Sequence, residues 1–376
     1  MDYRPQTLDE LARKSGSAAE KHALVGFDGF VDRIMKAVDK RHGKGSAFTA
    51  MQRITDFGNR INAAAGESAN IELFMEVEKL GGNGPIMANA VAASGIGVRY
   101  VGALGKPVHP VFADFATQTN AVSICDPGIT NAVEFEDGKI MLGTMASLDH
   151  VNYPSILATM GEGAFFDAVS RADLMAFVNW TMLPNMTNLM QDILSKVLPN
   201  LGPREDGRHF FFDLADPAKR SDSDLKAVLR LLGKFRNYGA ATLGLNLAEA
   251  KQVSHLLGQG DVANNGIALE GAAKRICREL DLSCVVIHPR EGAAAADHDD
   301  TAYVEGPFCA KPKISTGAGD HFNAGFSTAQ VLGLPLGAAL TVAVSTSGYY
   351  VRTAESPALG DIAGFIESWQ NGTLPA

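Results

Sequence analysis

The chain has 376 residues, and 46% of them are hydrophobic, which suffices to bury a large core. Its 33 Lys and Arg residues against 42 Asp and Glu residues give a net charge of -9, with no long basic run. This balance argues against a nucleic-acid or membrane-surface partner and favours a small molecule. The N-terminus lacks a basic segment followed by an apolar stretch, and no apolar run reaches spanning length, which predicts a soluble cytoplasmic protein.

Short apolar runs alternate along the chain with segments of helical spacing. The runs have the length and composition of strands buried on both faces, and they lie at 23–27, 174–179, 209–214, 241–245 and 284–288. The helical segments lie at 185–198, 221–236, 246–257 and 267–280. This alternation predicts an α/β fold with an open, doubly wound, mainly parallel sheet and helices on both faces, in a single domain over residues 1–376.

Two stretches interrupt this rhythm. Residues 69–80 ("ANIELFMEVEKL") and 131–145 have strand character, and the "EDGK" inside the second is a typical hairpin turn. We predict a small β lid formed by segments near 30–50, 69–80 and 121–145. The run "AAAAD" at 293–297 is interpreted as a short loop, and the acids of the "DHDD" that ends it as solvated.

The stretch "STGAGDHFNAGF" (315–326) places small residues before a single acid, Asp320, where apolar spacing indicates the start of a helix. The first N–H groups of a helix lack intrahelical partners and the helix dipole adds partial positive charge, so an anion can approach there. Gly317, Ala318 and Gly319 leave room for it. Asp320 could instead only stabilise the dipole, for about 0.3–1 kcal/mol. That alternative leaves the two glycines unexplained, because glycine weakens a helix start.

With three upstream motifs, this stretch resembles the ribokinase-like carbohydrate kinases, the PfkB family, whose C-terminal signature carries GAGD at a helix start. "GFDGFVD" (26–32) is similar to the family's first strand and its sugar-binding acid. "GGNGPIMANAVAASGIGVRYVGALG" (81–105) resembles the glycine-pair signature, and "NLAE" (246–249) the family's NxxE. The motifs follow the family's order and extend over nearly the whole chain.

The resemblance implies a kinase that uses ATP and Mg²⁺ to phosphorylate a hydroxyl of a sugar or sugar-like substrate. It assigns Asp320 as the general base and the N–H groups of Gly317, Ala318 and Gly319 as the anion hole. Because the sequence contains no GxxxxGK[ST] loop, the alternative chemistry of P-loop kinases is excluded.

The resemblance also implies a sugar site near two of the upstream motifs. A carboxylate after the first strand could accept hydrogen bonds from two hydroxyls, and a glycine pair lets backbone lie against a sugar beside an amide that donates and accepts. The candidate residues are Asp28, Asp32, Gly81, Gly82 and Asn83. One of the two acids could simply face solvent, and the glycine pair could simply form a tight turn before a helix that starts at Pro85. Asn179 and Trp180 are further candidates, with core packing as their alternative.

Asn246 and Glu249 have two interpretations. Asn at the N-cap with Glu three residues later is a capping box. The pair also follows the apolar run 241–245, at the carboxyl end of a predicted sheet strand where ligands of open α/β folds bind. There Glu249 could order a hydrated Mg²⁺ through water, with the nucleotide phosphates supplying other ligands.

The sequence departs from the family pattern at three places. Ile314 stands where the family usually has an acid that helps to hold a monovalent cation, so potassium activation is not expected. The asparagine that usually follows the glycine pair is replaced by Ile86, with Asn89 one turn later, which implies rearranged sugar contacts. His288-Pro289 stand where a small glycine-containing loop normally meets the nucleotide, so the phosphoryl donor is less firmly indicated than the kinase chemistry.

Two other functions remain open for this fold. A nucleoside kinase needs an aromatic slot for the base, whereas aromatic residues make up only 7% of the chain and do not cluster near 28–32 or 81–89. A non-catalytic sugar- or nucleotide-binding relative would not need Asp320. Lids of this family often pair subunits, so the resemblance also implies a homodimer.

Overall fold

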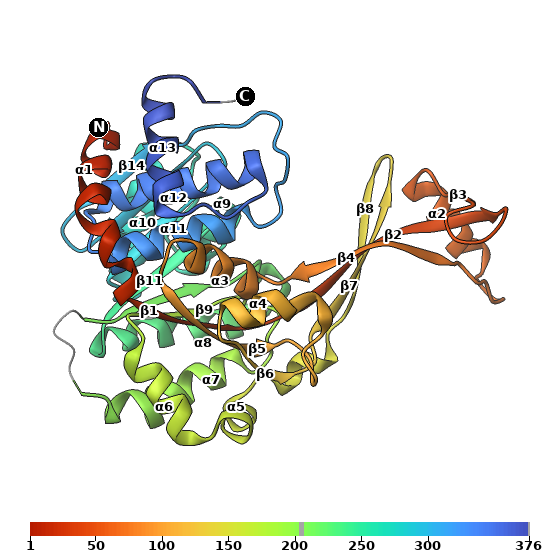
Figure 1. The fold of residues 1–376 in the computed structure, drawn as a ribbon, viewed down its shortest axis with the longest axis horizontal. Coiled ribbons are helices and arrows are strands. Elements are labelled where there is room, and N and C mark those ends of the chain that lie inside the picture. Colours follow the sequence, from red (N-terminus) through yellow and green to blue (C-terminus); the bar gives the residue numbers. More distant parts are fainter. Residues whose placement is uncertain (203–206, 375–376) are drawn as a thin grey trace.

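The computed structural model describes residues 1–202 and 207–374. Within these residues the strands form a nine-stranded sheet in the body of the molecule and a five-stranded sheet in an arm that projects from it (Figure 1). The strand order of the large sheet is β14-β13-β12-β11-β10-β9-β1-β5-β6. Its pairs from β6 to β12 are parallel, and β13 and β14 are added antiparallel. The predicted mainly parallel sheet is therefore confirmed.

The strands of the large sheet begin and end close to the predicted apolar runs. Their bounds are β1 His22–Phe27, β5 Gly97–Ala103, β6 Val122–Cys125, β9 Leu174–Phe177, β10 His209–Asp213, β11 Ala240–Leu245, β12 Cys284–Ile287, β13 Gly292–Asp297 and β14 Thr301–Glu305. Alternate residues of one strand face opposite cores: in β1, Ala23 and Val25 pack into one core, and Leu24 between them packs into the other. Burial on both sides explains why the sequence shows continuous apolar runs here.

Helices cover both faces of this sheet, as predicted for a doubly wound fold. One core is closed by α1 Arg4–Lys14, α3 Asn83–Ala93, α4 Ala113–Gln118, α11 Ala318–Val331, α12 Leu336–Thr353 and α13 Leu359–Gln370. The other is closed by α5 Tyr153–Met160, α6 Glu162–Arg171, α7 Met186–Asp192, α8 Asp222–Leu232, α9 Leu247–Leu256 and α10 Gly266–Glu279. Among the described residues, no helix combines the length and the apolar character that crossing a membrane requires.

The interpretation of residues 293–297 as a loop was wrong, because they form most of β13. This strand pairs with β12 and β14, and its alanines alternate between the two cores. Short side chains let helices approach both faces of the strand. A run of identical residues has no polar alternation, which hides the strand from a periodicity argument. Asp297 ends the run and accepts hydrogen bonds from the N–H groups of Asp299 (2.9 Å) and Asp300 (2.7 Å), which forms the turn into β14.

The arm contains the second sheet and one helix. Its elements are β2 Phe30–Arg41, β3 Phe48–Ala50, α2 Ile54–Ala63, β4 Leu73–Gly81, β7 Gly128–Phe135 and β8 Gly138–Thr144. Their small core includes Ala37, Phe57 and Phe135. A hairpin joins β7 to β8 at the predicted turn. The predicted lid segment near 121–145 began too early, because β6 pairs with β5 in the large sheet.

Candidate active site

The carboxyl ends of the parallel strands carry polar side chains, as expected where ligands of open α/β folds bind. Asp28 follows β1, Asp213 ends β10, Asn246 follows β11 and His288 follows β12. The N-terminus of α11, with the GAGD stretch, is placed at the same edge, because its Gly319 lines a cavity together with Asn246 and His288. The fold thus brings together motifs that are far apart in the sequence.

The first turn of α11 holds Asp320 in a buried position. Asp320 is 6% exposed, and Asn83 at the start of α3 donates a hydrogen bond from Nδ2 to its Oδ1 at 2.9 Å. Burial raises the pKa of Asp320 to about 7, and the charges of Asp28 and Glu249 act in the same direction, against the hydrogen bond from Asn83. This carboxylate is therefore a much better proton acceptor near neutral pH than an exposed aspartate.

The structural requirement for a small residue differs among the three positions before Asp320. Gly317 caps the helix with φ +90°, a left-handed conformation that favours glycine. A Cβ at Gly319 would only make ordinary contact, 3.5 Å from Cε1 of His288, so packing does not require glycine there. The N–H groups of Gly317 and Gly319 have no acceptor among the described residues, whereas that of Ala318 donates a long bond of 3.3 Å to the Ser315 carbonyl. The N–H groups of the two glycines are thus the most available of the predicted anion-hole donors.

Asp28 is fully buried and serves the N-terminus of α3. Its Oδ2 accepts from the Asn83 N–H at 3.0 Å and from Asn179 Nδ2 at 2.7 Å, and its Oδ1 accepts from the Gly84 N–H at 2.8 Å. Burial raises the pKa of Asp28 to about 6 against these donors. A Cβ at Gly84 would lie 2.4 Å from Asp28 Oδ1, so this contact requires the glycine. Asp28 therefore orients Asn83, and its side chain has no exposed surface.

Asp32, the second acid of this motif, lies on β2 beside the glycine pair. A Cβ at Gly81 would lie 2.4 Å from Asp32 Oδ2, and Gly82 has φ +101°. Burial raises the pKa of Asp32, and the charge of Lys79 opposes that shift. Asp32 is half-buried and lines a cavity of about 210 Å³ together with Asn89 of α3. Of the two predicted sugar-binding acids, Asp32 is the one that a ligand can reach.

Asn246 and Glu249 form the capping box at the start of α9. Asn246 Oδ1 accepts from the Glu249 N–H at 3.0 Å, and Glu249 Oε2 accepts from the Asn246 N–H at 2.8 Å. Glu249 Oε1 accepts from the Asp216 N–H at 2.9 Å. Burial raises the pKa of Glu249, whereas the hydrogen bonds from the Asp216 and Asn246 N–H groups act to lower it. Each carboxylate oxygen keeps a lone pair beyond its backbone bond, so the capping geometry and an interaction with a hydrated cation are compatible.

The sequence analysis missed Asp213, the last residue of β10. Asn323 of α11 donates to its Oδ2 at 2.7 Å. Burial raises the pKa of Asp213 well above its usual range, and the charges of Glu249 and Asp320 add to this. The available signal was an acid directly after the buried run "HFFF", at the end of a strand that the sequence places in the parallel sheet.

The loop before α11 is held by side chains that the sequence did not single out. His321 Nδ1 lies 2.8 Å from the Gly317 carbonyl, which can only accept, so Nδ1 carries the proton. His321 Nε2 then accepts from the Ser356 hydroxyl at 2.9 Å. The ring stacks on Tyr350 with centroids 3.5 Å apart, and the Tyr350 hydroxyl donates to the Thr316 carbonyl at 3.0 Å. Both loop carbonyls therefore have donors from the protein.

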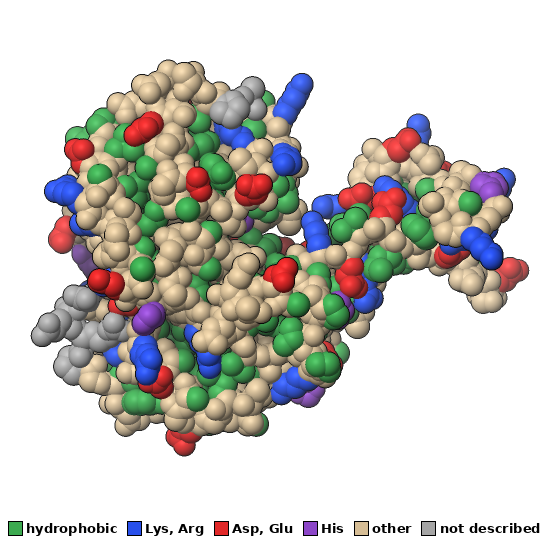
Figure 2. Space-filling view, viewed as in Figure 1, with side chains coloured by type: hydrophobic (Ala, Val, Ile, Leu, Met, Phe, Trp, Pro, Cys, Tyr) green, Lys and Arg blue, Asp and Glu red, His purple; other side chains and the backbone are tan. Residues whose placement is uncertain are grey.

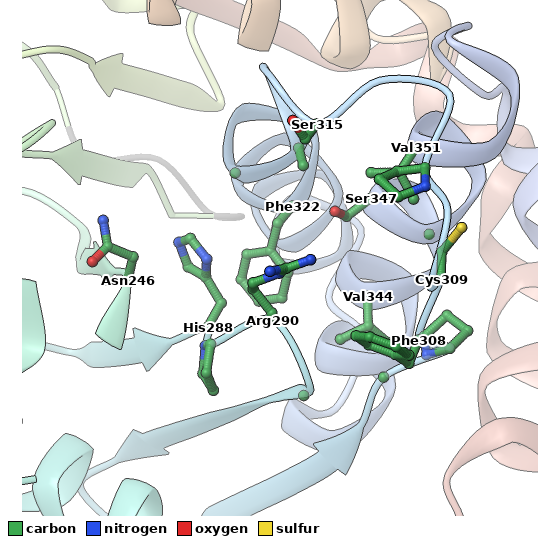
Figure 3. Close-up of a pocket in the computed structure, with 18 residues that line it drawn as sticks. Asn246, His288, Arg290, Phe308, Cys309, Ser315, Phe322, Val344, Ser347 and Val351 are labelled. Atoms are coloured by element: carbon green, nitrogen blue, oxygen red, sulfur yellow. The ribbon is translucent and has the colours of Figure 1, made fainter. Parts of the chain in front are cut away.

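A larger cavity of about 430 Å³ lies on the other side of this loop (Figure 3). Asn246, His288 and Gly319 line one end, and Phe308, Val344 and Val351 belong to the apolar remainder of its wall. The loop residues Ser315, Ala318 and Gly319 line this cavity, whereas Ile314, Thr316 and His321 line the smaller cavity with Asp32. The segment around Asp320 is thus a wall shared by two cavities.

Comparisons with known proteins agree with the resemblance seen in the motifs. The profile of the prokaryotic ketohexokinase family matches residues 12–369. The ketohexokinase of Haloferax volcanii is 26% identical over 348 residues, which are 92% of this chain and 91% of that protein.

Solved structures show the same fold at low sequence identity. A carbohydrate kinase from Agrobacterium tumefaciens has a TM-score of 0.63 at 18% identity, over 92% of this chain and 97% of that one. A ribokinase from Arabidopsis thaliana, solved with ribose and ATP, has a TM-score of 0.62 at 15% identity, over 92% and 98%. A nucleoside kinase from Methanocaldococcus jannaschii has a TM-score of 0.60 at 12% identity, over 93% and 98%. These likenesses confirm the ribokinase-like fold.

The raised pKa of Asp320 predicts a pH-dependent effect of Asp320→Asn on stability. The folded protein binds a proton more tightly than the unfolded chain between the ordinary pKa of 3.8 and the folded value of about 7. The wild-type carboxyl therefore lowers the free energy of unfolding as pH rises through this window. Melting temperatures measured from pH 4 to pH 8 should show the variant gaining stability relative to wild type as pH rises. Asp222→Asn, in the exposed first turn of α8, is the control; an equal effect of Asp320→Asn at both ends of the range would contradict the prediction.

Proposed function

Because the chain belongs to the prokaryotic ketohexokinase family, and is thus a sugar kinase of the ribokinase-like fold, we propose that it transfers the γ-phosphoryl group of ATP to a hydroxyl of a keto sugar. The observation that carries this proposal is the position of Asp320. It is buried at the N-terminus of α11, directly after backbone that lines the larger cavity, and hydrogen-bonded to Asn83. A proton acceptor thus lies beside the backbone N–H groups of a helix N-terminus, which are suited to binding a phosphate.

In this proposal Asp320 accepts the proton of the attacking hydroxyl. Its raised pKa matches a base that works near neutral pH, and the hydrogen bond from Asn83 fixes the direction of its carboxylate. The oxygen of the acceptor attacks the γ-phosphorus, the bond to the nucleotide's bridging oxygen breaks, and that oxygen leaves with ADP. The N–H groups of Gly317, Ala318 and Gly319 stabilise the charge on the phosphoryl oxygens, with those of the two glycines the most available.

The sugar is assigned to the side of the loop that faces the second sheet. Asp32 accepts hydrogen bonds from sugar hydroxyls, and the backbone of Gly81 and Gly82 lies against the sugar. Asn83, whose side-chain amide donates to Asp320, is proposed to contact the sugar as well. Asp28 holds Asn83 in place through its backbone N–H. The half-buried Asp32 carboxylate on the wall of the smaller cavity supports this assignment.

The nucleotide is assigned to the larger cavity. Its volume of about 430 Å³ is suitable for a nucleotide, and its apolar wall offers a surface for a base. Structures of related kinases were solved with ATP or ADP. Asn246 lines this cavity together with Gly319, and Glu249, which is paired with Asn246 in the capping box, would hold a hydrated Mg²⁺ through water near the phosphates. Mg²⁺ bound to the phosphates supplies charge neutralisation during transfer.

The second sheet is proposed as a lid and as a dimer interface. It projects from the body (Figure 1), and excluding water from the sugar would prevent wasteful hydrolysis of ATP. Large apolar side chains are exposed on it, including Met75 and Val77 of β4 and Met141 and Leu142 of β8. In the space-filling view, apolar side chains also appear on the surface of this arm (Figure 2). A homodimer through this surface would cover them.

The proposed function is tested by a coupled assay for ADP release from ATP and Mg²⁺, run across keto sugars, aldo sugars, sugar phosphates and nucleosides. We expect turnover with a keto sugar, and Asp320→Asn should lower it by about 10²–10⁴-fold, the usual loss on removing a general base. Calorimetry should show sugar and nucleotide binding retained. Asp222→Asn serves as the matched control for an acid in a first helical turn. Turnover with nucleosides alone, or near-native turnover of Asp320→Asn, would contradict the proposal.

The assignment of Glu249 predicts a changed magnesium requirement in Glu249→Gln. Because an amide interacts more weakly with the water shell of Mg²⁺, the concentration for half-maximal rate should rise, while a remaining carbonyl oxygen preserves part of the cap. Rates are measured over a magnesium titration, with melting temperatures alongside. Asp361→Asn alters the capping box of α13, away from the site, and should leave the magnesium requirement unchanged. A lower melting temperature with an unaltered magnesium requirement would leave Glu249 only its capping role.

The loop before α11 predicts little activation by potassium. Ile314 offers no side-chain oxygen, and the carbonyls of Thr316 and Gly317 already accept hydrogen bonds from Tyr350 and His321. A monovalent cation would have to displace these donors. Rates in potassium, sodium and tetramethylammonium chloride at matched ionic strength keep screening constant. A large rise with potassium alone would show that the loop does bind the ion.

A further inference from the structure

The loop between β12 and β13 presents two nitrogen-bearing side chains to the larger cavity. His288 and Arg290 both line it, and Figure 3 shows them between Asn246 on one side and Phe308 on the other. Within residues 1–202 and 207–374, the His288 ring makes no hydrogen bond to another residue, only one to its own backbone, and the Arg290 guanidinium makes neither a hydrogen bond nor an ion pair. The five N–H donors of the guanidinium are thus available to a ligand at this cavity, and the imidazole has no hydrogen-bond partner beyond its own backbone.

The His288 ring is held in place and directed at the start of α11. The backbone N–H of His288 donates to the Leu245 carbonyl at 2.9 Å, which anchors the residue at the end of the sheet. Its ring stacks on Phe322 of α11, with centroids 4.5 Å apart. Cε1 lies 3.5 Å from the position that a Cβ of Gly319 would occupy, and this carbon sits between the two ring nitrogens. A group that contacts the Gly319 backbone therefore comes within reach of an imidazole nitrogen.

The charge states of His288 and Arg290 suit hydrogen-bond donation to a phosphate. Burial lowers the pKa of His288 to about 4, so the ring is neutral at pH 7 and offers one N–H and one acceptor. Arg290 is exposed and remains charged. A guanidinium pairs with two oxygens of a phosphate at once, and hydrogen bonds to ionised groups are stronger than neutral ones.

We propose that His288 and Arg290 bind the phosphate groups of the nucleotide, His288 beside the N–H of Gly319 and Arg290 from the open side of the cavity. This inference rests on the proposed function. The base then lies toward Phe308, Val344 and Val351, where the wall is apolar. In this role, the side chains of His288 and Arg290 replace the backbone N–H groups with which a glycine-containing loop would bind the phosphates. This replacement gives a physical reason for the unusual His288-Pro289 pair.

The test compares ADP with adenosine, which has the same base and ribose but no phosphate. Dissociation constants are measured by calorimetry, with adenosine measured by displacement. His288→Phe keeps the ring stacked on Phe322 but removes both nitrogens, and Arg290→Ala removes the guanidinium. Each variant should weaken ADP binding about tenfold or more, as expected for a lost hydrogen bond to a charged group. Adenosine binding should stay within about twofold of wild type, a change below 1 kcal/mol at 1.4 kcal/mol per tenfold.

The controls separate this inference from the proposed function. Arg230→Ala on α8 removes the same charge away from the cavity and should leave ADP binding unchanged. Arg290 is exposed, so its variant reports on phosphate binding even if His288→Phe lowers the melting temperature. Unchanged ADP binding in Arg290→Ala and a folded His288→Phe, or an equal loss of ADP and adenosine, would overturn the inference. Failure of the wild type to bind any adenine nucleotide would instead count against the proposed function.

Discussion

A buried carboxylate organises this site. Asp28 is fully buried after β1 and accepts two N–H groups from the start of α3 and the side-chain amide of Asn179 after β9. In addition, its main-chain carbonyl accepts from the Tyr100 hydroxyl of β5 at 2.7 Å. Asp28 thereby fixes α3 against three neighbouring strands of the large sheet. The position of Asn83 depends on this arrangement, because its backbone N–H donates to Asp28. The position of the Asp320 carboxylate depends on it in turn, because the side-chain amide of Asn83 donates to Asp320.

This arrangement concentrates acidic groups at an electrostatic cost. Burial raises the pKa values of Asp213 and Asp320, and each is raised further by the charges of Glu249 and Asp28. Ionising one member therefore makes the ionisation of the others less favourable. Clusters of buried acids with strongly raised pKa values are typical of functional sites. In the proposed mechanism, a substrate hydroxyl that donates to Asp320 favours the ionised form of this carboxyl, so substrate binding would itself prepare the proposed base.

The sequence indicated the catalytic motifs because each is local. GAGD at a helix start and NxxE after a strand depend on neighbouring residues, and the structure places both at the carboxyl edge of the sheet. The contacts between motifs were not accessible, because Asn83 and Asp320 are 237 residues apart in the chain. For the same reason the sequence could not show that the Asp28 carboxylate accepts hydrogen bonds from the start of α3 and from Asn179. Asp213 was missed because its pattern is that of any strand end, and β13 because five small residues carry no periodicity.

The connections between the two sheets determine which part of the site can move. β2 begins two residues after Asp28, and β4 ends two residues before Asn83, so the arm is joined to the body at the residues that orient Asp320. Asp32 and Lys79 lie within these strands, whereas Asp28 and Asn83 are fixed to the large sheet and α3. On the other side, His321, Ser356 and Tyr350 hold the loop before Asp320. A motion of the arm would therefore displace the proposed sugar contacts and leave the proposed base and anion hole in place. In the proposed mechanism, closure over a sugar would bring the substrate to a catalytic centre that stays fixed, as phosphoryl transfer by positioning requires.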